Sequence, residues 1–200
     1  MSANITGFIG AHRTGKSTLV NRLTGLTKPS YKIEVSITVM QAKGGWESSN
    51  QSYDWETRKQ IQTHLLLQFR ELLHDVTHQR AWGGPLMTER TPLDLIGYLI
   101  LNAPESPTEE DIKFINNYTA ACVKLTDEFY NQIYFVQPGI PYKPESKSAS
   151  YETIEKLSDI YSAILLSQRI KPTLHIIPEG MLDLNQRLAF IERTSNVRLY

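Results

Sequence analysis

The feature that most constrains this chain is a glycine-rich loop near its start, at residues 10–18, with the sequence GAHRTGKST. The loop fits the pattern G-x-x-x-x-G-K-[ST], in which glycines let backbone N–H groups turn inward around a phosphate. In this pattern Lys16 reaches the β- and γ-phosphates of a nucleoside triphosphate, and the Ser17 hydroxyl can bind Mg²⁺. The motif therefore makes a nucleoside triphosphate the first ligand to consider.

The residues on either side of the loop supply the context that the motif requires. Residues 5–9 are typical of a short buried strand, and residues 17–23 carry apolar side chains at helical spacing before Gly25 ends the pattern. Strand, loop and helix in this order place a phosphate at a helix N-terminus, where free N–H groups and the helix dipole favour an anion. We therefore predict phosphate binding; the alternative is a glycine turn that binds nothing.

The whole loop is assigned to the donor nucleotide. The residues expected to contact it are Gly10, His12, Arg13, Thr14, Gly15, Lys16, Ser17 and Thr18. Arg13 adds a second cation to the loop, and both a phosphate contact and a solvated position suit it. We expect His12 to shape the loop or to face substrate rather than to catalyse.

Composition narrows the class of protein. The chain has 200 residues, 40% of them hydrophobic, which suits one domain with a sizeable core. Its 21 basic and 21 acidic side chains give a formal net charge of zero. This balance argues mildly against binding to long nucleic acid and favours a small substrate. A lone Cys122 excludes an internal disulfide and fits a reducing cytoplasm. We expect a cytoplasmic chain without a signal peptide or a membrane span.

Strands and helices are expected to alternate along the chain. The further strands are predicted at residues 31–37, 86–88, 132–136 and 173–177, and the further helices at residues 54–79, from 91, from 108, 151–168 and 182–192. Thr91 and Asp94 suit the two ends of a capping box, with Pro92 at the first helical position. This order predicts an α/β fold: a three-layer sandwich whose parallel sheet has helices on both faces, in one domain of residues 1–200.

Polar side chains at the strand ends are the candidates for the second half of a site. In open α/β sheets, ligands bind outside the carboxyl ends of the strands. Glu34 and the pair Glu89 and Arg90 are expected there. The structural alternative for Glu89 and Arg90 is that they form an ion pair with each other at the end of the strand. For Glu34, a structural role is as consistent with the sequence as a functional one.

On residues 10–18, 89–94 and 135–141, the sequence resembles the P-loop nucleoside and nucleotide kinases. Within this class it is similar to phage deoxynucleoside monophosphate kinases and to nicotinamide riboside kinase domains. The resemblance implies a nucleotide-kinase-like fold over the whole chain, with ATP and Mg²⁺ as cofactors. It also implies a lid at about residues 138–152, where related kinases carry arginines. This segment offers only Lys143 and Lys147, which lack the bidentate fork.

The resemblance also implies roles for individual residues. The implied catalytic set is Lys16, Glu89, Arg90 and Glu34, with Ser17 and Glu89 on Mg²⁺. Arg90 would hold the acceptor or the transferring phosphate, and Glu34 would lie near the acceptor hydroxyl. Phosphoryl transfer needs positioning and positive charge, and a carboxylate base is useful only when the acceptor is a neutral hydroxyl.

Two further segments gain a role from the resemblance. At the start of the long helix, the region that faces the acceptor base in related kinases holds Tyr53, Trp55, Arg58 and Gln62. Partial core packing is an equally good alternative for Trp55. Residues 178–180 follow the last strand, where such kinases place the adenine of ATP.

The leading hypothesis is ATP- and Mg²⁺-dependent phosphoryl transfer to a small nucleotide-type acceptor, with a deoxynucleoside monophosphate favoured. A nucleoside such as nicotinamide riboside is a near rival, and a modified base in DNA is a third option. A regulatory NTPase fits less well, because the last two predicted strands are followed by Gln137 and Pro178 rather than by Asp. A non-catalytic binding module is disfavoured by the intact loop. The expected location is the cytoplasm (the host's, if a phage encodes the chain), without a membrane partner; a homodimer is left open.

Overall fold

The computed structural model describes residues 5–26, 31–33, 35–46, 53–78, 85–141 and 150–195, apart from the side chain of Tyr31. The elements are β1 (Ile5–Ile9), α1 (Lys16–Leu26), β2 (Tyr31–Ile33), α2 (Ile37–Lys43), α3 (Trp55–His78), β3 (Leu86–Thr88), α4 (Pro92–Leu101), α5 (Glu109–Phe129), β4 (Tyr130–Val136), α6 (Tyr151–Ser167), β5 (Thr173–Ile177) and α7 (Leu184–Thr194). The strands form one five-stranded parallel sheet in the order β2-β3-β1-β4-β5. The predicted α/β fold is confirmed.

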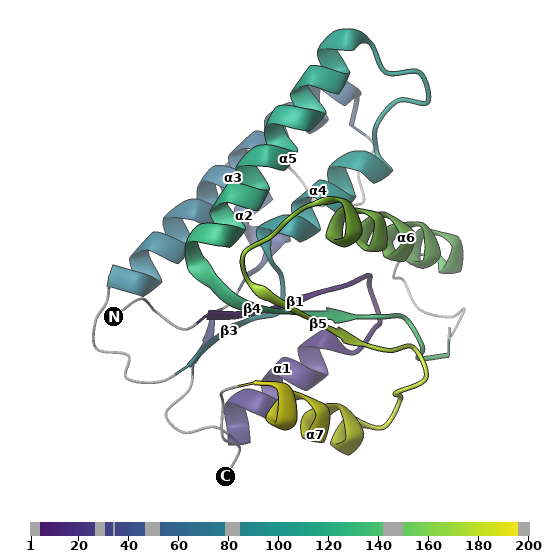
Figure 1. Ribbon diagram of the computed structural model, residues 1–200. Helices are drawn as coiled ribbons and strands as arrows, with labels where there is room; N and C mark the ends of the chain where they lie inside the picture. Colours follow the sequence, from purple (N-terminus) through teal and green to yellow (C-terminus); the bar gives the residue numbers. More distant parts are fainter. Residues whose placement is uncertain are drawn as a thin grey trace.

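Helices cover both faces of the sheet, as Figure 1 shows: α1 and α7 lie on one face, and α3 to α6 on the other. Alternation along β1 explains the two hydrophobic cores, because successive side chains of a strand point to opposite faces. Ile5 and Ile9 belong to the core beneath α3 to α6, whereas Phe8 belongs to the core that α1 and α7 share. The three-layer sandwich follows from this two-sided burial.

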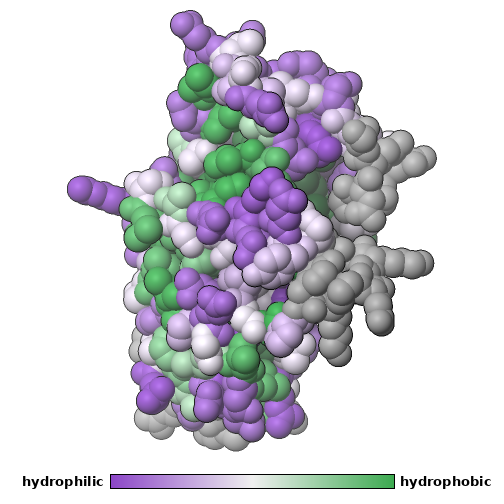
Figure 2. Space-filling model, turned by 90° about the vertical axis from the view of Figure 1, so that its right-hand side faces the viewer, coloured by the Kyte–Doolittle hydropathy of each residue, from purple (hydrophilic) through white to green (hydrophobic). Residues whose placement is uncertain are grey.

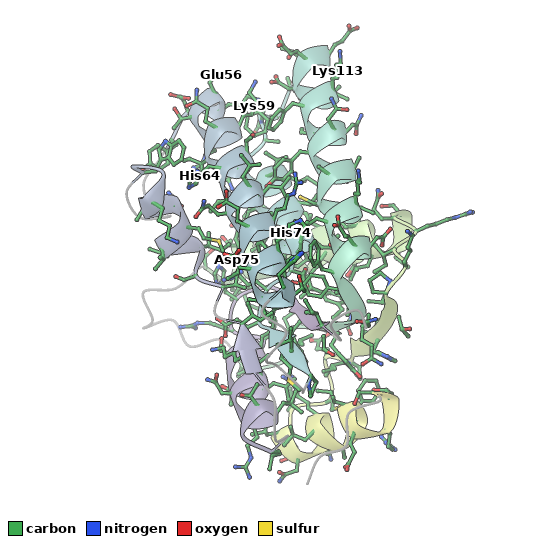
Figure 3. All side chains as sticks on the ribbon, turned by 90° about the vertical axis from the view of Figure 1, so that its left-hand side faces the viewer. Glu56, Lys59, His64, His74, Asp75 and Lys113 are labelled. Carbon is green, nitrogen blue, oxygen red and sulfur yellow. The ribbon has the colours of Figure 1, made fainter. Side chains whose placement is uncertain are left out.

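Helices α3 and α5 extend away from the sheet, side by side (Figures 1 and 3). Glu56 and Lys59 lie at the far end of α3, and His74 and Asp75 lie at the end nearer the sheet. Lys59 joins the two helices, because its Nζ lies 3.2 Å from Asp111 Oδ1 on α5. Hydrogen bonds from Thr108 and Trp55 hold the pKa of the Asp111 carboxyl well below its usual range.

The segment after β2 corrects the sequence prediction of a strand at residues 31–37. Among the described residues of this segment, Tyr31–Ile33 pair in the sheet, and Ile37–Lys43 form the helix α2. Ser36 begins this helix, since its hydroxyl accepts a hydrogen bond from the Val39 amide at 3.3 Å. The β-branched run Ile37, Thr38 and Val39 favours a strand locally, but burial of the next turn against α3 stabilises the helix.

The ends of two other helices also differ from their predicted positions. Helix α1 passes through Gly25 and reaches Leu26, because Gly25 does not adopt the positive φ with which a glycine commonly ends a helix. Helix α7 begins at Leu184 rather than Leu182, since the Asp183 carboxylate caps it by accepting from the Gln186 amide at 2.9 Å.

The surface mixes hydrophobic and hydrophilic residues. Figure 2 shows hydrophobic residues gathered in the upper half of one face, interrupted by hydrophilic ones. Among the described residues, none of the helices combines the length and the apolar character needed to cross a membrane. The predicted single domain of residues 1–200 and the lid at 138–152 stay predictions, since residues 142–149 lie outside the described ranges.

Candidate functional site

The loop between β1 and α1 has a backbone that favours glycine at two positions. Gly10 has φ of 153° and Gly15 has φ of 86°. A Cβ at Gly10 would lie 2.5 Å from the Val136 carbonyl oxygen, so a side chain there would collide with the end of β4. Arg13 has φ of 62°, a left-handed conformation that costs energy in a residue with a side chain. The surrounding structure therefore imposes this loop shape.

Lys16 is buried inside the loop. Its Nζ donates hydrogen bonds to the carbonyl oxygens of Gly10 and Ala11, each at 2.6 Å. Burial lowers the pKa of Lys16 to about 8, although the nearby Asp94 carboxylate opposes the shift. The ammonium group therefore lies at the loop's own backbone, where a bound polyphosphate would compete with the carbonyls for it.

Arg187 on α7 binds the backbone of the phosphate loop through a hydrogen bond to the Thr14 carbonyl oxygen, a contact that the sequence analysis did not predict. The side chain is 2% exposed, and its Nη1 donates to the Thr14 carbonyl oxygen at 2.6 Å. Its Nε donates to the Met181 carbonyl oxygen. The two partners of the Nη1 bond are 173 residues apart, so no local pattern announces the contact.

Two cavities of about 600 and 590 Å³ open beside the loop, a size that suits small ligands. His12 lines both of them. The first also includes Glu89, Arg90 and residues of α2, α3 and α4; the second includes residues 137–141 and one side of α6. The loop residue His12 thus lies where the two cavities adjoin, and the predicted residues Glu89 and Arg90 share the first cavity with it.

A chain of hydrogen bonds joins Arg90 to His12 through Tyr98. Arg90 Nη1 donates to the Tyr98 hydroxyl at 3.1 Å, and this hydroxyl lies 2.8 Å from His12 Nε2. Burial, with the charges of Arg90 and Lys16, lowers the pKa of His12 to about 4, so the ring is neutral at pH 7. The Tyr98 hydroxyl accepts from Arg90 and has one proton of its own to donate, so we assign His12 Nε2 as the acceptor.

Asp94, on α4, forms an ion pair with Arg90 and so adds to the chain of hydrogen bonds between Arg90 and His12. It is fully buried, and its Oδ2 accepts from the Thr91 amide at 2.7 Å and from the Thr91 hydroxyl at 3.0 Å. Its Oδ1 lies 3.9 Å from Arg90 Nη1. Burial raises the pKa of Asp94, and the adjacent Arg90 opposes this rise. The predicted capping role of Asp94 is confirmed, and the same side chain also orients Arg90.

Glu89 and Arg90 have separate ionic partners. Glu89 Oε2 lies 3.4 Å from Lys32 Nζ on β2, whereas the partner of Arg90 is Asp94. Glu89 Oε2 is buried and accepts no hydrogen bond from any group within the described ranges. The ion pair between Glu89 and Arg90, offered above as the structural alternative, is therefore absent among the residues described. Glu34 lies outside them, as do the lid residues Lys143 and Lys147.

The first cavity is walled by the start of α3. The four residues singled out from the sequence, Tyr53, Trp55, Arg58 and Gln62, all line it. Trp55 Nε1 donates to Asp111 Oδ1 at 2.6 Å, and Gln62 Oε1 accepts from the Tyr118 hydroxyl at 3.0 Å. Because Asp111 and Tyr118 both belong to α5, this helix fixes the wall from behind. Trp55 also packs against the core, as its structural alternative predicted.

The second cavity differs in charge from the first. Among the described residues that line it, the formally charged side chains are Arg13, Glu155, Asp159 and Glu179. Two of the carboxylates, Glu155 and Asp159, belong to α6, the helix that follows the predicted lid segment. The side of α6 that faces the second cavity is therefore acidic.

Solved structures with this fold include several small-molecule kinases. The chain is similar to a thymidylate kinase from Candida albicans (TM-score 0.66, 14% identity, 100% of this chain and 97% of the other). It is similar to a deoxyadenosine kinase from M. mycoides, solved with dCMP and dCDP (TM-score 0.65, 10% identity, 95% and 97%). A third is NadR, solved with NAD and AMP-PNP (TM-score 0.64, 16% identity, 99% and 51%), of which this chain spans about half the length.

These likenesses define the class of fold. No protein-family model matches the sequence, and no curated protein matches it by sequence. The five-stranded parallel sheet and the helices around it nonetheless give this chain the same fold as these kinases. The resemblance stated from the sequence is thereby confirmed as a likeness of fold.

Proposed function

We propose that this chain is a kinase that transfers the γ-phosphate of ATP to a small nucleotide-type acceptor, most favourably a deoxynucleoside monophosphate. The observation that carries the proposal is the position of His12, a phosphate-loop residue that lines two adjoining cavities of similar volume. A transferase needs both substrates at one point, whereas a hydrolase or a binding module needs only the donor cavity. The kinase neighbours, which include NadR with AMP-PNP, support the same assignment.

On the donor side, the phosphate loop would hold the triphosphate. The positive φ of Gly10 and Gly15 allows the backbone N–H groups to converge on an anion, and Lys16 supplies a charge at the same place. The remaining loop residues, His12, Arg13, Thr14, Ser17 and Thr18, complete the proposed donor contacts. We propose the second cavity, which extends to Glu179, for the rest of ATP.

The residues present fit a magnesium ion. Mg²⁺ takes oxygen ligands from one or two carboxylates and from substrate phosphates. Glu89 offers a buried carboxylate oxygen that accepts no hydrogen bond from the described residues and lies 3.4 Å from Lys32 Nζ, and Ser17 offers an exposed hydroxyl at the start of α1. When bound, the ion would neutralise charge on the transferring phosphate. Glu89 and Ser17 are the residues that we propose to hold it.

Charge favours an anionic acceptor in the first cavity. Of the described side chains that line it, Arg58, Arg90 and Glu89 carry formal charge, and Glu89 is paired with Lys32 at 3.4 Å. The balance is positive, which suits a monophosphate better than a neutral nucleoside. A phosphate acceptor needs no general base, so an oxygen of the acceptor phosphate would attack the γ-phosphorus as its bond to ADP breaks.

A nucleoside acceptor is the second candidate, and the likeness to NadR and deoxyadenosine kinase favours it. It would require a base near the acceptor hydroxyl, the role that the resemblance gives to Glu34. A modified base in DNA stays a third candidate. Against it, the first cavity has the volume of a small-ligand site and the chain has no net charge.

An ADP-release assay tests the proposal. ATP and Mg²⁺ are supplied with a panel of nucleosides, deoxynucleoside monophosphates and DNA oligonucleotides. We expect acceptor-dependent ADP release, greatest with one of the monophosphates. Release with a nucleoside alone would shift the assignment to the second candidate, and ADP release that ignores every acceptor would overturn the kinase proposal.

A further inference from the structure

Arg187 fixes the orientation of one peptide group in the phosphate loop. Its Nη1 donates to the Thr14 carbonyl oxygen at 2.6 Å. In a trans peptide the C=O and the following N–H point in opposite directions. With the Thr14 carbonyl held toward α7, the Gly15 N–H must point away from α7, toward the inside of the loop. That N–H is one of the donors that a phosphate loop uses.

The guanidinium is packed directly against this peptide. A Cβ built at Gly15 would lie 3.1 Å from Arg187 Nη1 and 3.1 Å from Ile140 Cδ1, so the glycine leaves room for both. A cationic donor also polarises the peptide that accepts from it, which strengthens the N–H on the other side as a donor. The contact therefore improves the position and the strength of the Gly15 N–H together.

The same side chain ties the loop to the segment after β5. Its Nε donates to the carbonyl oxygen of Met181, whose own amide donates to the Pro178 carbonyl oxygen at 3.0 Å. This turn is the one that the sequence resemblance gives to the adenine. One guanidinium thus connects the two parts of the chain expected at the two ends of ATP.

The burial of Arg187 is costly for a purely structural contact. The side chain is 2% exposed, has no salt bridge with any described residue, and has an Nη2 atom without a hydrogen-bond partner there. Burying an unpaired cation is unfavourable, whereas a polyphosphate in the adjoining loop would supply the compensating negative charge. The arrangement is therefore better balanced with an anion in the loop than without one.

We propose that Arg187 is a positioning residue for the donor triphosphate, which it assists by orienting the Thr14–Gly15 peptide and by fixing the loop to the turn at residues 178–181. The proposal rests on the donor half of the proposed function and not on the identity of the acceptor. It makes α7, at the other end of the sequence from the loop, a part of the donor site.

Inorganic triphosphate is the probe that tests Arg187 without requiring catalysis. We expect Arg187→Met to weaken triphosphate binding, measured by calorimetry, by about tenfold or more, since a charge-assisted hydrogen bond is lost. Arg187→Lys, which keeps a cation and can keep one of the two contacts, should recover part of the affinity. Arg193→Met, at an exposed arginine of the same helix, should bind triphosphate like the parent chain.

The NMR resonance of the Gly15 amide reports on the orientation of this peptide, which a general loss of stability in the variant would not change selectively. In ¹⁵N-labelled protein this resonance should shift on addition of triphosphate, and this shift should shrink in Arg187→Met while the acceptor-side residues keep their resonances. Unchanged triphosphate affinity in a folded Arg187→Met chain would overturn the inference. If that variant does not fold, equal affinity in Arg187→Lys and parent, with an equal Gly15 shift, would overturn it. A parent chain that binds triphosphate without phosphorylating any acceptor would contradict the proposed function and leave this inference standing.

Discussion

The two halves that we propose for the site, a donor half and an acceptor half, are built in different ways. The donor half is largely one continuous loop, whose shape depends on glycines and a lysine within residues 10–16. The acceptor half is assembled from β3, α2, α3 and α4, with α5 fixing the wall from behind. A local motif can specify phosphate binding by itself, whereas the choice of acceptor depends on contacts among segments far apart in the sequence.

The largest effect should come from the donor half. Lys16→Ala removes the buried ammonium group that we propose for the triphosphate, and we expect ADP release to fall by about 10²–10³-fold, as for loss of one preorganised electrostatic contact. The matched control is Lys124→Ala, at an exposed position of α5, which should leave activity unchanged. Full activity in Lys16→Ala would remove the basis for the assigned donor site.

The second prediction distinguishes the proposed acceptor half from the proposed donor half. Arg90→Met removes one of the two arginines that line the first cavity, so acceptor-dependent ADP release should fall by about tenfold to a hundredfold, while affinity for inorganic triphosphate stays within about twofold of the parent. Exposed Arg70 on α3 provides the control, as Arg70→Met. If Arg90→Met weakened triphosphate binding as strongly as it reduced transfer, the division into halves would be wrong.

The third prediction concerns stability. Asp94→Ala deletes the buried carboxylate that accepts from Thr91 and orients Arg90, so the free energy of unfolding should fall by about 1–3 kcal/mol. Urea unfolding followed by circular dichroism measures this change. Asp75→Ala, an exposed position on α3 that Figure 3 labels, should change stability little. Equal stability of the two variants would show that the Asp94 anchor is dispensable.

The smallest effect is a proton equilibrium at the junction of the cavities. The folded chain should protonate His12 only near pH 4, whereas the unfolded chain does so near pH 6.5. Between these values the unfolded state binds the proton and the folded state does not, so His12 should make the fold less stable as pH falls from 6.5 toward 4. An NMR titration of the imidazole resonances measures this pKa. A midpoint near 6.5 would contradict the assignment of His12 as a half-buried, neutral imidazole at pH 7.

The sequence predicted features set by neighbouring residues better than contacts between distant segments, for a physical reason. The loop, β1, α1 and the cap at Thr91 depend on neighbours in sequence, and each was predicted close to its observed position. Arg187 could not be found in this way, because its partner Thr14 is 173 residues away. Tyr98 was also missed, since its helical spacing does not reveal that its hydroxyl joins Arg90 to His12.

Helix α2 shows the same limit within one segment. The strand predicted at residues 31–37 extended into the start of this segment, but Ser36 caps a helix there and two residues of the helix are buried. The start of α2 lines the first cavity, so this incorrect strand prediction concerns the proposed acceptor half. The strand-end argument predicted Glu89 and Arg90 for the same site, and both line the first cavity with His12, yet the sequence did not reveal their separate pairing with Lys32 and Asp94.

The most direct test is a molecule that occupies both cavities at once. Adenosine joined through five phosphates to a deoxynucleoside, prepared with each of the four bases, would span a donor and an acceptor that meet at His12. We predict that at least one such molecule binds about tenfold or more tightly than ATP and competes with both ATP and the deoxynucleoside monophosphate, because two binding events become one. If all four bind no more tightly than ATP and none competes with an acceptor, the two cavities do not form one phosphotransfer site.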